Sequence, residues 1–388
     1  RDAQESRGLG DVYKRQRVAY LLAATYAIMK VYSGDVTQAV VHSTFAAFIG
    51  ALLSFVYLGI LYARYIPKIK GLLATSKDRV VIDFATSFKL MIRDSIPFVL
   101  LGSGIIIAQL IDTYTFSQIM QATSPLLLVE ISELYGTLSL DVDKLMMIII
   151  SLAVAMATSA VPAVTSLYAK GDVRATSHLV QRILTIFLFV MLPASFGMMA
   201  IADNVYHLFY AEGSPSGPAL LMTGAVSSIF LGSYTVLSTI LQSMDYRRLA
   251  IRYLLVGIVV KAITQYPLVA LFHAHGALLA TLLAFLVASV LMFFELNRRL
   301  HFNYRRFVND TLAILIVTAL MLVLTSLWNM ALNRIFGVTG RGLTFVKIVI
   351  DMIIAVGIYA LGMGLLGKLG LILGDRHQDL QDKLKVFQ

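Results

Sequence analysis

The sequence predicts an all-α polytopic membrane protein with about ten transmembrane helices. Hydrophobic residues make up 58 % of the 388 residues and charged residues only 14 %, whereas a soluble domain usually carries about 25 % charged residues. The mean hydropathy is +0.80. The apolar residues fall in blocks of roughly 20, the length of helix that crosses a hydrocarbon core of ~30 Å. A soluble enzyme domain is therefore excluded.

Ten apolar blocks give the predicted spans, and the first of them is short for a full crossing. Their bounds are residues 17–32, 37–62, 96–114, 145–168, 180–202, 219–242, 253–272, 276–296, 312–328 and 344–367. Residues 1–16 are polar and lack the apolar region of a signal peptide. The stretch RGLGDVYKRQ resembles read-through of sequencing-adapter DNA. We therefore expect residues 1–16 to be non-native and the true N-terminus to lie upstream of this chain.

Basic residues indicate the orientation of the spans. Loops on one side of the predicted membrane, together with the C-terminal tail, hold twenty-one Lys and Arg residues, against only Lys144, Arg334, Arg341 and Lys347 on the other side. Cytoplasmic loops carry the excess of positive charge, so the tail, residues 368–388, is predicted to be cytoplasmic. The net charge of +10 is explained by this topology, and no nucleic-acid partner is expected.

Several chemistries are absent from the pattern. With no cysteine, disulfides, Cys-ligated zinc and thiol catalysis are excluded. The histidines show no metal-ligand spacing beyond the pair His273 and His275, and no catalytic constellation stands out. The run GMGLLGK ends at Lys368 and is followed by Leu369, where a phosphate-binding loop needs Ser or Thr. We expect no enzyme activity, metal, cofactor or ATP.

Ionisable residues inside spans are candidates for function because they are costly in a membrane. Lys261 lies well inside its span, and Gln265 and Tyr266 could share a face with it, just before Pro267. A cation there would suit a phosphate or another anionic ligand. The alternative is that Lys261 extends to the interface or pairs with a carboxylate for structural reasons.

Two further spans carry polar residues. Ser103 lies between Gly102 and Gly104, which allow a bend or a close helix contact, and Gln109 and Asp112 are i,i+3 neighbours that face the same way. We expect this stripe to line a cavity, the alternative being that Asp112 lies at the outer interface.

Hydroxyl residues and prolines mark two possible breaks. Thr158 and Ser159 precede Pro162, and Pro193 occurs in the next span. Proline removes a backbone hydrogen bond, and hydroxyl groups can satisfy freed carbonyls. We predict Thr158 and Ser159 as cavity residues and Pro162 and Pro193 as hinges, although kinks without any site are also common.

Three stretches of the sequence carry a family resemblance: residues 95–116 (SIPFVLLGSGIIIAQLIDTYTF), 156–172 (MATSAVPAVTSLYAKGD) and 238–272. They resemble the polysaccharide-biosynthesis branch of the MOP exporter superfamily. Within that branch the chain is similar to the stage V sporulation protein B-like membrane proteins, which are related to lipid II flippases. The resemblance extends from about Arg17 to Gly367.

The resemblance implies fourteen spans in the family, arranged as two six-helix lobes and two extra helices, of which the ten here would be the fifth to the fourteenth. Residues 17–67 would then be a remnant of the N-terminal lobe, 68–95 a basic cytoplasmic linker, 96–300 the C-terminal lobe and 301–367 the extra pair. It implies a flippase of the bacterial cytoplasmic membrane that moves an undecaprenyl-linked cell-wall or polysaccharide precursor by alternating access. The partners would be a lipid-linked oligosaccharide and membrane lipid, and the last two spans would hold the lipid tail.

One departure matters. Gram-negative lipid II flippases use arginines in their first, second and eighth spans, but residues 145–168 contain no Arg. Their diphosphate site therefore cannot be transferred, and Lys261 is a candidate from physical reasoning alone. Two alternatives remain: a multidrug/cation antiporter of the same fold, and a membrane glycosyltransferase or ligase, in which Glu130 or Glu133 would have to act.

The charge bias generates a test of topology. Because the chain has no cysteine, single cysteines can be introduced at Lys77, Arg248, Lys383 and Asp141 without background. We expect an impermeant thiol label applied to intact cells to miss the first three and to modify only the cysteine at Asp141. The opposite pattern at any two positions would overturn the orientation.

Overall fold

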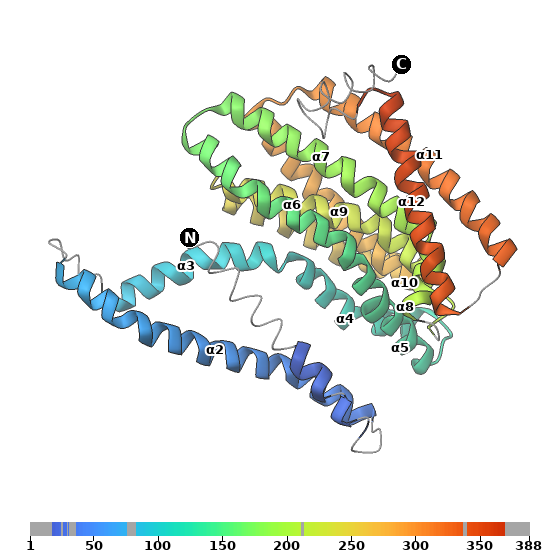
Figure 1. The fold of residues 1–388 in the computed structure, drawn as a ribbon, viewed down its shortest axis with the longest axis horizontal. Helices are drawn as coiled ribbons and strands as arrows, with labels where there is room; N and C mark the ends of the chain where they lie inside the picture. Colours follow the sequence, from blue (N-terminus) through green and yellow to red (C-terminus); the bar gives the residue numbers. More distant parts are fainter. Residues whose placement is uncertain are drawn as a thin grey trace. The chain divides into compact units, whose positions relative to one another are not determined.

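The computed structural model describes residues 18–24, 26–28, 30, 36–75, 83–210, 213–336 and 340–368 (Figure 1). Apart from short turns and connecting segments, the described residues are helical. Residues 1–16, predicted to be non-native, and all of the predicted tail after Lys368 lie outside the described residues. The chain divides into two compact units, Arg1–Ser87 and Phe88–Gln388, which are described separately below.

The first unit contains one long helix, α2 (Val36–Thr75), and a shorter apolar helical segment, Val18–Ile28. Helix α2 continues through Pro67 and beyond the predicted span, which was expected to end at residue 62. Helix α3 (Phe84–Gly102) begins at the end of this unit and continues into the second. The predicted linker at 68–95 is therefore helical over residues 68–75 and 84–95.

In the second unit, α3 and α4 (Gly104–Thr123) form a pair bent by 61° at Ser103, at the double glycine that the sequence singled out. A side chain at Gly102 would meet nothing, whereas a Cβ at Gly104 would lie 2.5 Å from the hydroxyl of Tyr234. That hydroxyl donates to the Leu101 carbonyl at 2.7 Å. The bend is therefore held by a hydrogen bond to a carbonyl at the break, which is how irregular backbone is tolerated inside a membrane.

The remaining helices follow in chain order. They are α5 (Leu128–Gly136), the π-helix η1 (Thr137–Val142), α6 (Asp143–Ala169), α7 (Val173–Ala200), α8 (Ala202–Phe209), α9 (Gly217–Ser243), α10 (Arg247–Leu300), α11 (Tyr304–Phe336) and α12 (Arg341–Leu365). Both α6 and α7 run without interruption through Pro162 and Pro193. Helix α10 likewise continues past Pro267.

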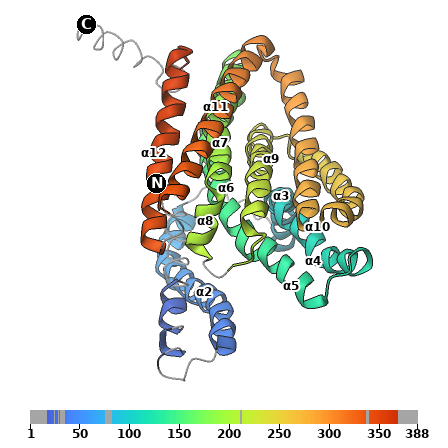
Figure 2. The same cartoon turned by 90° about the vertical axis from the view of Figure 1, so that its right-hand side faces the viewer.

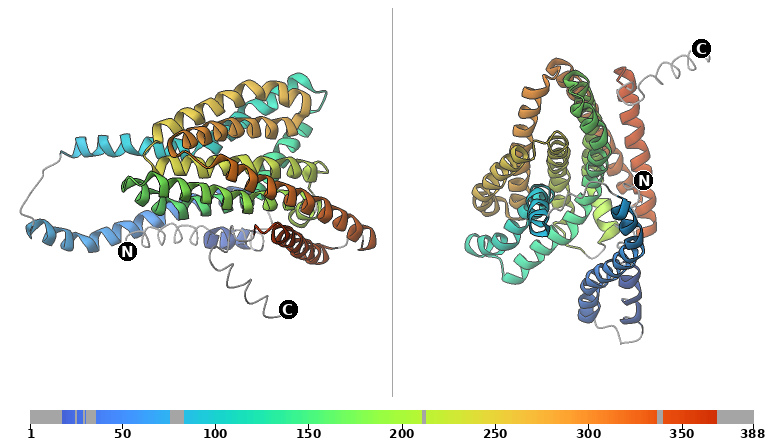
Figure 3. Two further views of the ribbon diagram at one scale, coloured as in Figure 1. Left: turned by 90° about the horizontal axis from the view of Figure 1, so that it is seen from above. Right: turned by 90° about the vertical axis from the view of Figure 1, so that its left-hand side faces the viewer.

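Helix α10 is a hairpin of two predicted spans. A straight helix of its 54 residues would be about 80 Å long, far more than a membrane core. The chain instead reverses at His273, whose φ of 51° lies in the left-handed region. Hydrogen bonds between the two limbs pair Tyr253 with Glu295 and Lys261 with Thr281. The paired residues are closer in sequence the nearer they lie to the turn, as in an antiparallel hairpin. Figure 3 shows the yellow and orange limbs side by side.

Helix α9 is the centre of the second unit. It lies between α10 on one side and α6 and α7 on the other (Figure 2). Small residues allow this packing: a Cβ at Gly224 would lie 2.7 Å from the sulfur of Met146, and one at Gly232 would lie 2.7 Å from the terminal methyl of Met191. Membrane helices pack closely through such residues. Helices α11 and α12 pack on α7, where the Tyr359 hydroxyl donates to the Phe189 carbonyl.

Within the described residues, seven helices are long and apolar enough to cross a membrane, or eight when α3 and α4 count as one bent span. The α10 hairpin counts as two crossings, and Val18–Ile28 is a shorter apolar helix. The prediction of an all-α polytopic membrane protein with about ten spans is confirmed.

The α10 hairpin should be sensitive to any side chain at Gly276, because a Cβ there would overlap the carbonyl of Leu268. Overpacking of this kind costs about 1–3 kcal/mol. We expect Gly276→Ala to lower the unfolding temperature of the purified protein in detergent. Gly357→Ala in α12 is the matched control, since a Cβ there meets nothing. Equal unfolding temperatures for the two variants would contradict the close approach of the limbs.

Candidate functional site

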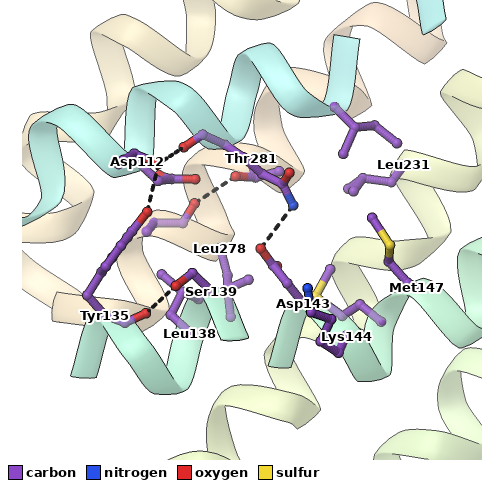
Figure 4. Close-up of a pocket in the computed structure, with 15 residues that line it drawn as sticks. Asp112, Tyr135, Leu138, Ser139, Asp143, Lys144, Met147, Leu231, Leu278 and Thr281 are labelled. Atoms are coloured by element: carbon purple, nitrogen blue, oxygen red, sulfur yellow. Dashed lines mark hydrogen bonds between the residues drawn. The ribbon is translucent and has the colours of Figure 1, made fainter. Parts of the chain in front are cut away.

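A polar cavity of about 220 Å³ lies in the second unit, among α4, the α5–η1–α6 segment, α9 and the second limb of α10 (Figure 4). Its polar lining comes from Gln109, Asp112, Thr113, Tyr135, Ser139, Asp143, Lys144 and Thr281. The predicted stripe of Gln109 and Asp112 on α4 faces this space. Their role in substrate binding stays a prediction.

Behind the cavity, Lys261 is fully buried and is paired with Asp112. Its Nζ donates to Asp112 Oδ1 at 2.9 Å and Oδ2 at 2.8 Å, and to Thr281 Oγ1 at 2.5 Å. The Asp112 carboxylate is 14 % exposed, whereas the Lys261 side chain is 0 % exposed. In this structure the carboxylate, and not the ammonium group, therefore reaches the cavity.

Gln265 completes the arrangement from the next turn of α10. Its Nε2 donates to Asp112 Oδ1 at 2.8 Å, so residues at i and i+4 on one helix bind the same carboxylate. The buried Gln265 Oε1 accepts no hydrogen bond from the residues that the structure describes. The ion pair thus joins α4 to the first limb of α10, and Thr281 joins both to the second limb.

A second carboxylate, Asp143, lies at the start of α6 and accepts a hydrogen bond from Gln109 Nε2 at 2.9 Å. Hydroxyl groups form another side of the cavity: Tyr135 donates to Thr113 Oγ1, which donates to the Gln109 carbonyl. Figure 4 shows Asp143, Asp112 and Thr281 around the same space. The exposed Lys144 adds a cation to the lining.

The size and chemistry of the cavity limit what it can hold. Pockets for drug-sized ligands usually measure about 300–1,000 Å³, so this space suits water or a small polar group and not a sugar-bearing headgroup. Among the described residues, no group of three or more His, Asp or Glu side chains could hold a metal ion. We interpret the cluster as a charged core that positions helices.

The other predicted site residues lie elsewhere. Thr158 and Ser159 are exposed, and their hydroxyls donate to carbonyls one turn earlier in α6. Tyr266 is 58 % exposed, and Ser103 lies at the α3–α4 bend. The hinge roles of Pro162 and Pro193 stay predictions. Glu130 accepts a hydrogen bond from the Leu127 backbone N–H at the start of α5.

Sequence reasoning singled out neither Thr281 nor Asp143. Thr281 contacts Lys261 because the α10 limbs reverse at His273, and this register would have to be known to find it. Asp143 lies 34 residues from Gln109, and the contact depends on how α5 and η1 place the start of α6. A signal was nevertheless available, since Asp143 lies two residues before the apolar block 145–168.

Comparisons with known proteins agree with one another. The family described as Lipid II flippase MurJ matches residues 24–340. The Lipid II flippase MurJ of Bacillus subtilis (strain 168) is 28 % identical over 313 residues, which cover 79 % of this chain and 56 % of that protein. The probable low-salt glycan biosynthesis flippase Agl15 of Haloferax volcanii is 23 % identical over 137 residues, 35 % of this chain and 29 % of that protein.

A solved structure described as Lipid II flippase MurJ, inward closed conformation, matches with a TM-score of 0.61 and 14 % identity, and covers 90 % of this chain and 66 % of that one. This likeness shows the fold. The chain spans about half the length of the curated Bacillus relative. The predicted resemblance to lipid II flippases is confirmed.

The ion pair can be tested by stability. Lys261→Ala would leave the Asp112 carboxylate buried without its cation, and breaking a buried pair costs about 3–5 kcal/mol. We expect a large loss of stability in Lys261→Ala and recovery of most of it in the double variant Lys261→Met, Asp112→Leu, measured by unfolding in detergent.

Lys144→Ala is the matched control, because this exposed lysine borders the same cavity and has no ion pair in the described part of the chain. Its stability should change by about 0.5 kcal/mol or less. A double variant no more stable than Lys261→Ala would show that the pair does not hold these helices together.

Proposed function

Because this chain belongs to the Lipid II flippase MurJ family, we propose that it moves an undecaprenyl-linked cell-wall or polysaccharide precursor across the membrane by alternating access. The family match over residues 24–340 carries this proposal. The family is one of transporters. Family membership and the apolar helices of this chain together make it a multi-pass protein of the bacterial plasma membrane. We place its C-terminus in the cytoplasm on the charge bias alone.

The α3–α4 bend supports a moving part within the second unit. Helix α4 is fixed by the Asp112–Lys261 pair, and the bend is held by Tyr234. Helix α3, in contrast, buries only Leu101 among its side chains. Segments with few buried contacts reorient at low cost, so α3 is the part of this pair that can change direction about Ser103 while α4 stays docked.

An apolar groove supports a lipid-linked substrate. It measures about 610 Å³ and is lined by residues of α6, α7, α11 and α12, including Leu152, Val190, Met198, Met321, Ile348 and Val356. Its surface suits the isoprenoid tail of a lipid carrier, as the family resemblance led us to expect of the last two spans. The partners in this proposal are thus a lipid-linked oligosaccharide and membrane lipid, without ATP or nucleic acid.

The two alternatives find less support. A cation antiporter of this fold needs a buried carboxylate that is free to exchange its ion. Asp112 is already paired with Lys261, so such an antiporter would have to use Asp351, which is buried in α12 beside the apolar groove. A glycosyltransferase would rely on Glu130 or Glu133, and the Glu130 carboxylate is engaged by the Leu127 backbone N–H. The geometry around Asp112 and around Glu130 favours a structural role for each.

A chimaera tests the proposal despite the difference in length from the relatives. Residues 24–340 would replace the matching region of the Bacillus subtilis Lipid II flippase MurJ, in cells depleted of their own flippase. We expect the chimaera to restore growth and to expose the lipid-linked precursor in the outer leaflet. A chimaera present in the membrane at normal abundance that exports no precursor would contradict the proposed function.

A further inference from the structure

One end of the second unit holds a cavity lined mainly by arginines, separate from the cavity around Asp112. It measures about 730 Å³ and lies where α3 approaches the α9–α10 connection and the end of α10. The arginines are Arg93, Arg247, Arg248, Arg252 and Arg299, and the only lining carboxylates are Asp94 and Asp245. Guanidinium groups this close together repel one another unless an anion lies near them, so their convergence needs a physical explanation.

Two of the arginines are neutralised and fixed in place. Arg247 donates to Asp245 Oδ1 from Nε at 2.9 Å and from Nη2 at 2.6 Å, and its guanidinium lies 5.0 Å from the Phe98 ring centroid. Arg299 donates to Glu295 Oε1 at 2.6 Å and stacks 3.7 Å from the centroid of Tyr246. These cation–π and ion-pair interactions hold Arg247 and Arg299 in place along one side of the cavity.

The other three guanidinium groups, on Arg93, Arg248 and Arg252, are exposed. Within the described residues they make no hydrogen bond or ion pair. They converge on one cavity from α3 and from the first turns of α10. Of the two carboxylates that line it, Asp245 is paired with Arg247, which leaves Asp94 to oppose these three arginines. An excess of positive charge therefore faces the space between them.

The backbone adds to this field. Helix α10 begins at Arg247, and no side chain caps its N-terminus. The N–H groups of a first turn and the helix dipole both favour an anion. The positive end of α10 and the free guanidinium groups thus point to a ligand of the same charge from two independent sources.

We propose that Arg93, Arg248 and Arg252 form a binding site for the phosphate group of a membrane-anchored molecule. Guanidinium groups bind phosphate oxygens through paired, charge-assisted hydrogen bonds. All three arginines precede an apolar span: Arg93 lies before residues 96–114, and Arg248 and Arg252 lie before residues 253–272. The site therefore lies at the height of lipid phosphates. The phosphate comes either from an anionic phospholipid headgroup or from the diphosphate of a lipid-linked precursor.

Binding of one probe would be measured on the purified full chain in three environments. Inorganic pyrophosphate is titrated calorimetrically in detergent, and again with the protein in bilayer discs of phosphatidylglycerol or of phosphatidylcholine. The test variant is R93Q/R248Q/R252Q. The matched control is R298Q/R305Q/R306Q, which removes the same charge from exposed arginines that do not line the cavity.

We expect wild-type protein and the control variant to bind pyrophosphate with affinities within about threefold of each other. The test variant should lose at least about tenfold per arginine, since hydrogen bonds to charged groups are individually strong. Both variants should unfold at the wild-type temperature without ligand, because the substituted side chains are exposed. Equal losses of pyrophosphate affinity in the two variants, or no pyrophosphate binding by wild-type protein in any of the three environments, would overturn the site.

The discs identify the source of the phosphate. Pyrophosphate binding weakened in phosphatidylglycerol but retained in phosphatidylcholine shows that a phospholipid headgroup occupies the site. Equal binding in both discs shows that the site prefers a diphosphate over a phospholipid. Neither result depends on transport. The phosphate site can therefore be disproved while the proposed flippase function stands, and the flippase function can be disproved while the phosphate site stands.

Discussion

The buried Lys261–Asp112 pair is the constraint on which the arrangement of the second unit depends. A charged side chain in the interior of a membrane protein is costly unless its charge and its hydrogen-bond donors are satisfied. Lys261 satisfies its ammonium group with both oxygens of Asp112 and with Thr281. These partners belong to α4 and to the second limb of α10. All three segments must therefore be in place together, because the loss of any one leaves a buried charge or donor without its partner.

The bend at Ser103 follows from this requirement. Asp112 can reach Lys261 only if α4 lies against the hairpin, and the 61° break lets α3 leave in a different direction. Gly104 has no side chain, so Tyr234 of α9 can approach the break and donate to the Leu101 carbonyl. The central helix α9 thus stabilises the bend that the ion pair demands. In this apolar bundle, polar contacts determine the directions in which the helices run, and small residues determine how closely the helices pack.

Hydropathy and length predicted the fold class and the positions of most spans, because both follow from the thickness of a bilayer. Lys261, Gln109 and Asp112 could also be singled out, since each is a polar exception in an apolar run. Their partners could not, because Lys261 and Asp112 are 149 residues apart and the contact of Lys261 with Thr281 depends on the reversal at His273. Thr158 and Ser159 do not line the cavity for a related reason. The packing of α6 against α7 and α9 decides which face of α6 is buried, and the sequence of α6 alone does not show this. The helical conformation of residues 68–75 was not predicted, although basic residues are compatible with helix.

Two charged regions of the second unit, the Lys261–Asp112 pair and the arginine-lined cavity, have different electrostatic roles. Lys261 was predicted to receive a phosphate, but its ammonium group is saturated by Asp112 and Thr281 and has no exposed surface. An incoming anion would have to displace a carboxylate that lies in direct contact with it. Arg93, Arg248 and Arg252 impose no such requirement, because they are exposed and unpaired among the described residues. Interior charge that is fully paired specifies structure, whereas charge left unpaired at the membrane boundary remains free to bind a ligand.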